Sequence, residues 1–101
     1  MDIYTQKDLK EFLKSYFSQK GISVKIVLFG SRARGQNEPY SDIDLALISD
    51  ADLTGELVEL KGIVEESNLP YKVDIVIFEK LPPEMKEEIL KEGKVWVDLK
   101  S

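Results

Sequence analysis

The sequence contains neither cysteine nor histidine. Without cysteine it has no disulfide framework, no thiolate zinc site and no cysteine nucleophile. Without histidine it lacks the commonest general base, the Ser-His-Asp triad and nearly every ordinary zinc site. Any chemistry must therefore rest on carboxylates, hydroxyls, lysines, arginines or a hard metal ion.

Basic residues are fewer than acidic ones: the chain has 14 Lys and Arg and 19 Asp and Glu, which gives a net charge of −5. Because general binding of duplex nucleic acid depends on neutralising phosphates, we expect none here. A local site that handles one nucleotide through metal ions stays open. No apolar run approaches the ~18 residues of a membrane span, and the N-terminus lacks a basic-then-apolar signal pattern. We therefore expect no membrane association and a cytoplasmic location.

The composition that is present predicts one folded domain over residues 1–101. Hydrophobic residues make up 43% and charged residues 33%, which argues against disorder. A chain of 101 residues is near the common size of a single domain and is long enough to bury a core.

Helices and strands are expected to alternate along the chain. Thr5 and Asp8 resemble a loose capping box, and Gly21 stands where the helix that they open would stop. Further helices are predicted from 53 to about 67 and over 84–92, and strands over 24–29, 42–48, 73–78 and 94–99. This order predicts a small α/β or α+β fold, with a mixed sheet of three to four strands flanked by helices.

Three aspartates occupy two of the apolar strands. Asp42 and Asp44 share one face of their strand because side chains alternate, and Asp74 lies between Val73 and Ile75 in the next. If these strands are neighbours, Asp74 faces the pair across about 5 Å. Such carboxylates raise each other's pKa unless a divalent cation such as Mg²⁺ neutralises them. The plainer alternative is that all three are solvated residues on a half-exposed sheet.

A turn follows the first strand directly, at Gly30 and Ser31. Glycine lets the backbone approach a ligand closely, and the serine hydroxyl and nearby N–H groups can bond phosphate oxygens. Arg32 and Arg34 lie close enough in sequence to neutralise a triphosphate. Taken singly, Gly-Ser is also an ordinary turn dipeptide, and these arginines are also typical surface residues.

Together, GSRARG and SDIDLALI followed by a strand-borne aspartate resemble the signature of the DNA polymerase β-like nucleotidyltransferases. The likeness is greatest to the minimal nucleotidyltransferases and spans roughly residues 24–78. It implies a nucleotidyltransferase fold in which Gly30 and Ser31 hold the β- and γ-phosphates of the nucleotide. The family's loop arginine corresponds to Arg32 or Arg34, and the sequence does not decide between them.

The same resemblance assigns the carboxylates. It implies that Asp42 and Asp44 bind two Mg²⁺ ions, and that Asp74 helps to bind metal and activates the acceptor hydroxyl. An in-line attack on the α-phosphorus of ATP would then expel pyrophosphate. On this view catalysis is mostly positioning and charge neutralisation.

The resemblance also implies a partner. Minimal nucleotidyltransferases are often paired with small HEPN-type ribonuclease toxins, and act as antitoxins by transferring AMP from ATP to a toxin tyrosine. Larger relatives carry extra domains for their acceptors, so the acceptor of this chain is expected to be another protein.

Two rival readings remain at the level of sequence. In the first, the chain neutralises a toxin by contact alone, with Tyr4, Tyr40 or Trp96 as apolar anchors, although Trp96 also reads as a strand residue covering the sheet edge. In the second it is a pure Ca²⁺ or Mg²⁺ module, but no loop has EF-hand spacing. The acceptor, the choice of ATP over other nucleotides and the oligomeric state stay open.

Overall fold

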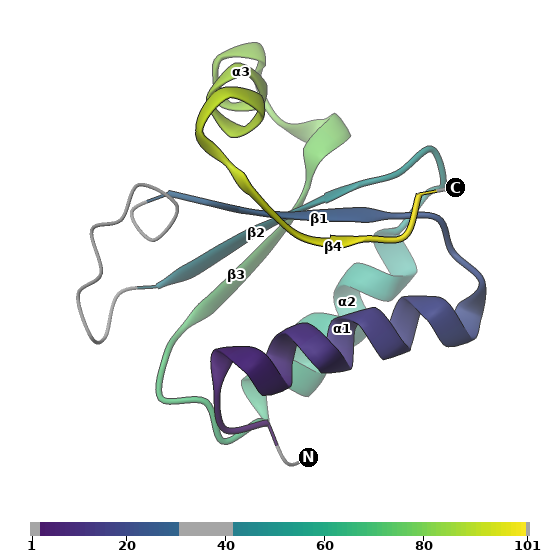
Figure 1. Cartoon of the computed structure of the whole chain (residues 1–101), viewed down its shortest axis with the longest axis vertical. Helices are drawn as coiled ribbons and strands as arrows, with labels where there is room; N and C mark the ends of the chain where they lie inside the picture. Colours follow the sequence, from purple (N-terminus) through teal and green to yellow (C-terminus); the bar gives the residue numbers. More distant parts are fainter. Residues whose placement is uncertain (1–2, 31–41, 101) are drawn as a thin grey trace.

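The computed structural model describes residues 3–30 and 42–100. In chain order (Figure 1) the elements are α1 (Gln6–Lys20), β1 (Lys25–Phe29), β2 (Ile43–Ile48), α2 (Thr54–Glu65), β3 (Val73–Ile77), the 3₁₀ helix η1 (Phe78–Lys80), α3 (Pro83–Glu92) and β4 (Lys94–Asp98). The strands form one sheet in the order β3-β2-β1-β4. β1 runs antiparallel to β2 and β4, whereas β2 and β3 are parallel. The predicted mixed sheet flanked by helices is confirmed.

The ends of α1 lie where the sequence predicted them. The Thr5 hydroxyl accepts a hydrogen bond from the Asp8 N–H at 3.1 Å, and the Asp8 carboxylate accepts one from the Thr5 N–H at 3.2 Å. At the other end Gly21 adopts the left-handed conformation with φ 65°, which glycine adopts without steric cost. Leu9, Leu13 and Phe17 recur at helical spacing and are fully buried. α1 therefore turns an apolar face toward the sheet.

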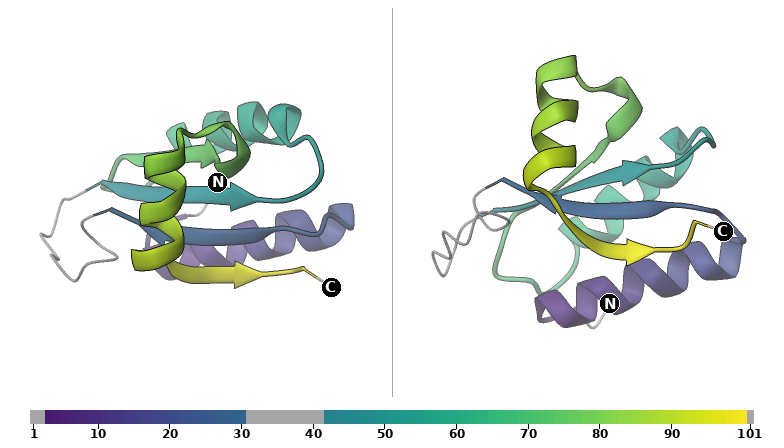
Figure 2. Two further views of the ribbon diagram at one scale, coloured as in Figure 1. Left: turned by 90° about the horizontal axis from the view of Figure 1, so that it is seen from above. Right: turned by 45° about the horizontal axis from the view of Figure 1, so that its top comes forward.

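The sheet has two unlike faces. α1 and α2 cover one of them over the main core, which includes three fully buried side chains of β2, Ile43, Leu45 and Leu47. α3 stands on the opposite face, as Figure 2 shows, where Ile89 packs against Val27 and Ala46. Because strand side chains alternate, Asp44 falls on the α3 face with Ala46. The aspartate is thus kept out of the main core.

Some predicted boundaries were wrong by one or two residues. Phe78 was assigned to a strand but begins η1, because the chain leaves the sheet there and buries the Phe78 ring beside Ile89 of α3. Asp42 precedes β2 rather than opening it. α2 ends at Glu65, after which the Ser67 hydroxyl donates to the Val64 carbonyl at 2.6 Å.

No helix within the described ranges is both long and apolar enough to cross a membrane.

Candidate active site

Two of the three aspartates are brought together by the parallel pairing of β2 and β3. Asp44 is the direct partner of Asp74 in the strand register, and on its other side Asp44 faces Phe29 at the end of β1. The two strands are therefore neighbours, which the sequence had left open, and the two carboxylates share one face. Asp42 lies one residue before β2 and is exposed.

The environment of Asp44 disfavours its charge. Partial burial is the main cause that raises the pKa of Asp44, and the carboxylates of Asp74 and then Asp42 raise it further. Asp44 thus interacts electrostatically with both of the other aspartates. A positive charge placed among them would relieve it.

The three carboxylates do not form a ready metal cage. Within residues 3–30 and 42–100, no group of three or more acidic side chains is spaced to hold a metal ion. The donor chemistry nevertheless suits a hard cation, because carboxylate oxygens are the ligands that Mg²⁺ takes. A cation would also offset the repulsion from Asp74 and Asp42, which, after burial, raises the pKa of Asp44.

Gly30 forms the wall of this site at the end of β1. Its φ of +79° is one that side-chain-bearing residues rarely adopt, and a Cβ built on it would lie 2.5 Å from the Asp44 Oδ2 atom. The group that lies close to Gly30 is thus the Asp44 carboxylate, and the predicted close approach of the Gly30 backbone to a phosphate stays a prediction. Ser31, Arg32 and Arg34 lie outside the described residues, so their predicted phosphate roles remain predictions.

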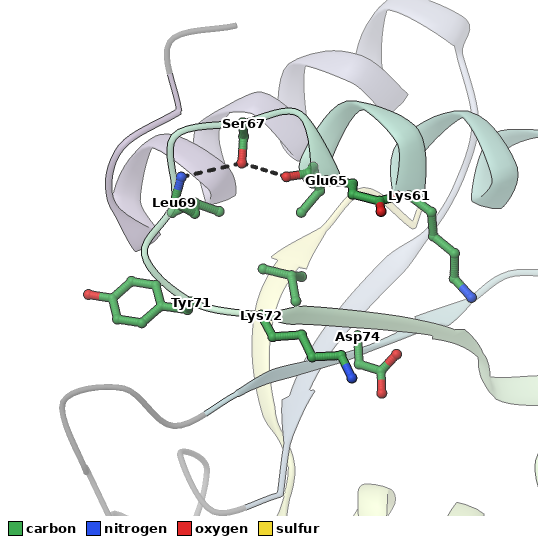
Figure 3. A pocket seen from close by; sticks show the side chains of 9 residues that line it. Lys61, Glu65, Ser67, Leu69, Tyr71, Lys72 and Asp74 are labelled. Carbon is green, nitrogen blue, oxygen red and sulfur yellow. Dashed lines mark hydrogen bonds between the residues drawn. The ribbon is translucent and has the colours of Figure 1, made fainter.

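A pocket of about 370 Å³ borders Asp74 at the outer edge of β3 (Figure 3). It is lined by Lys61, Val64, Glu65, Ser67, Leu69, Tyr71, Lys72, Val73 and Asp74. The Ser67 hydroxyl shapes its rim, since it also accepts a hydrogen bond from the Leu69 N–H at 3.4 Å. The carboxylate of Asp74 is thus reached from an open hollow.

Lys72 is a candidate site residue that the sequence analysis missed. Its carbonyl accepts a hydrogen bond from the Ile43 N–H at 2.9 Å, so its backbone continues the ladder of β3. Figure 3 shows its side chain running toward the Asp74 carboxylate. The signal was present in the sequence, because residues two apart in an extended segment share a side. Lys72 therefore lies on the same side of the extended segment as Asp74 and lines the same pocket.

Comparison with known proteins identifies the family to which the chain is similar. The family described as polymerase beta nucleotidyltransferase matches residues 9–100. The probable protein adenylyltransferase MntA of Haemophilus influenzae is 32% identical over 96 residues, which cover 90% of this chain and 84% of that protein. A protein from Methanocaldococcus jannaschii, also named as a protein adenylyltransferase, is 32% identical over 97 residues, covering 89% of this chain and 95% of its own length.

A solved structure has the same fold. A crystal structure of a toxin–antitoxin with AMP-PNP aligns with a TM-score of 0.63 and 21% identity, covering 88% of this chain and 73% of that one. At this identity the likeness concerns the fold alone, whereas the family model and the two relatives match in sequence. The chain accordingly belongs to the polymerase beta nucleotidyltransferase family and is a nucleotidyltransferase, as its motifs implied.

Proposed function

We propose that this chain transfers AMP from ATP to a tyrosine hydroxyl of a HEPN-type ribonuclease toxin and thereby acts as its antitoxin. The observation that carries the proposal is the in-register pair Asp44 and Asp74 beside Gly30, with the pKa of Asp44 raised. The names of the two relatives support a protein as the acceptor. The toxin–antitoxin of similar fold, bound to an ATP analogue, supports the nucleotide and the partner.

The reaction assigns each residue one task. Gly30 and Ser31 hold the β- and γ-phosphates of ATP, with Arg32 or Arg34 neutralising their charge. In the transfer, a bond forms between the acceptor oxygen and the α-phosphorus, and the bond from that phosphorus to the bridging oxygen breaks, releasing pyrophosphate.

The carboxylates would hold a divalent metal. Asp42, Asp44 and Asp74 are the residues that would bind Mg²⁺, two ions in the full site. When bound, Mg²⁺ neutralises the triphosphate and lowers the pKa of the acceptor hydroxyl. Since the chain has no histidine, the Asp74 carboxylate is the base that takes the hydroxyl proton. Asp74 is exposed and borders an open pocket, so an acceptor side chain can reach it.

Labelled ATP tests the proposal directly. The chain is incubated with ATP labelled in its α-phosphate and with the protein encoded by its neighbouring gene, which we expect to be the HEPN-type toxin, and label is expected on a tyrosine of that protein. Asp44→Asn should slow transfer at least ~100-fold, because it removes a carboxylate that would hold the cation that neutralises the developing charge. Asp50→Asn is the matched control, since Asp50 is an exposed carboxylate beyond the far end of β2. Removing divalent metal with EDTA should stop transfer.

Two outcomes would overturn the enzymatic proposal. Transfer at the normal rate by Asp44→Asn would show that this carboxylate does not take part. Inhibition of the toxin without any label reaching it would favour the binding-only alternative. One of that alternative's anchors is already weakened, because Trp96 lies partly buried in β4 and packs against the main core.

A further inference from the structure

A second surface lies at the opposite edge of the sheet from the acidic pair. The strand order puts β3 at one edge and β4 at the other, so within the described residues β4 pairs with β1 alone. An edge strand presents unpaired backbone N–H and C=O groups and can accept a further strand. β4 is therefore a template for an extended segment of another chain.

A groove of about 360 Å³ runs between this edge and α1, which lies alongside β4 in Figure 2. It is lined by Lys7, Lys10, Glu11, Lys14, Trp96, Val97 and Asp98. The three lysines come from consecutive turns of α1, at spacings of three and four residues, so they form one row facing the strand. All three are exposed.

This groove has a charge unlike that of the chain as a whole. The net charge is −5, yet three lysines outnumber the two acidic residues, Glu11 and Asp98, that line the groove. Exposed lysines also flank β4, at its first residue, Lys94, and just beyond its end, at Lys100. The positive charge along this edge is therefore complementary to an acidic ligand.

The same features narrow the choice of ligand. Two copies of the chain pairing through β4 would set one lysine row against another, which disfavours self-association. Single-stranded nucleic acid would need a free aromatic face for stacking, but Trp96 is partly buried against the main core. An extended protein segment that carries carboxylates uses both the unpaired strand and the lysines.

We propose that the β4 edge and the lysine row of α1 bind an extended acidic segment of the acceptor protein, which adds a fifth strand beside β4. The identity of the partner rests on the proposed function. Because β4 and β3 are opposite edges, this docking leaves Asp44 and Asp74 open to ATP and to the acceptor hydroxyl. The surface thus holds the acceptor while the acidic pair modifies it.

Charge reversal tests the surface with the HEPN-type protein as the probe. Lys10→Glu/Lys14→Glu should raise the Kd for that protein at least about tenfold, as expected when attractive pairs become repulsive, and leave the Kd for ATP unchanged. Lys86→Glu/Lys91→Glu is the control, because it makes the same change of charge on α3. Circular dichroism verifies that both variants fold. Hydrogen exchange should show new protection over 94–98 when the partner binds.

The outcomes separate this inference from the proposed function. Normal partner affinity in Lys10→Glu/Lys14→Glu, or new protection along β3 in place of β4, overturns the docking surface even if AMP transfer continues. Displacement of the partner by a short oligouridine assigns the groove to nucleic acid and also overturns it. If binding of the partner protects residues 94–98 from hydrogen exchange but no AMP is transferred, the docking surface is supported and the proposed function is contradicted. Asp44→Asn should bind the partner normally and fail to modify it.

Discussion

At the scale of single residues, Asp44 lowers the stability of the folded protein at the position where the proposed reaction takes place. Asp44 is held beside Asp74 and is partly buried, so its charged form is disfavoured in the folded protein. A fold selected for stability alone would place an apolar side chain here, as it does at Ala46 on the same face of β2. A residue that lowers the stability of the metal-free protein is expected at a position where the reaction requires that residue.

Asp44→Asn should therefore stabilise the metal-free protein while abolishing AMP transfer. The pKa of Asp44 is raised in the folded state, so between the two pKa values the folded protein binds more protons than the unfolded chain. The free energy of unfolding therefore falls as pH rises from the ordinary value of 3.8 through the folded pKa. In the asparagine variant, which has no carboxyl group to titrate here, the free energy of unfolding should fall less over this pH range. After allowance for solvent screening the gain is about 1 kcal/mol or less. Urea unfolding from about pH 3 to about pH 7 measures it, and a variant less stable than wild type at neutral pH contradicts the account.

Gly30→Ala should impair both the fold and the site. Its positive φ costs an alanine roughly 1–2 kcal/mol, and the new methyl would collide with the Asp44 carboxylate and force it to move. We expect a lower Tm and transfer slowed at least ~10-fold. Gly21→Ala is the matched control, because Gly21 also has positive φ but nothing lies within 4 Å of its Cβ position. Equal losses of activity in the two variants would contradict a specific role for Gly30.

At the scale of elements, local signals decide where helices begin and end. The capping box of Thr5 and Asp8, the left-handed Gly21 and the Gly93 that ends α3 are all legible in the sequence because each acts on its own neighbours. The end of the third strand could not be predicted, because Phe78 leaves the sheet and packs in a cluster with Val27 and Ala46, which are remote in sequence. Non-local packing sets that boundary.

Thr5→Ala should destabilise the protein by about 1 kcal/mol, because the Asp8 N–H at the start of α1 loses its acceptor. Thr5→Ser, which keeps the hydroxyl, should stay close to wild type. The pKa of Asp8 is lowered, chiefly because its carboxylate accepts the Tyr4 N–H, so its contribution is present above the ordinary value of 3.8 and is lost as pH falls through the folded pKa. Chemical denaturation of the three proteins at neutral pH measures the difference. Equal stability of the alanine and serine variants would refute the cap.

At the scale of the whole molecule, topology assembles the site. The parallel pairing of β2 with β3 joins Asp44 to Asp74, and the antiparallel pairing of β2 with β1 adds the end of β1 and Gly30. The residue types and the shared face were predictable from alternation along each strand. The strand order was not, because it depends on pairing between segments that lie far apart in the sequence.

Mg²⁺ should raise the Tm of the wild-type chain and leave that of Asp44→Asn nearly unchanged. A ligand that binds only the folded state stabilises it by about 2.7 kcal/mol at 100 times its Kd. Thermal melts with and without Mg²⁺ and ATP measure the effect, with Asp50→Asn as a control that should respond like wild type. An equal rise of Tm in Asp44→Asn would place the cation elsewhere.

The most direct test of the central claim is a double-mutant cycle on the rate of AMP transfer. Wild type, Asp44→Asn, Asp74→Asn and the double variant are compared under single-turnover conditions with saturating ATP. If the paired carboxylates act as one unit, each single change removes nearly all of the rate and the double variant is no slower than the slower single variant. If the two losses multiply, or if either single variant keeps the wild-type rate, Asp44 and Asp74 do not form a shared catalytic centre.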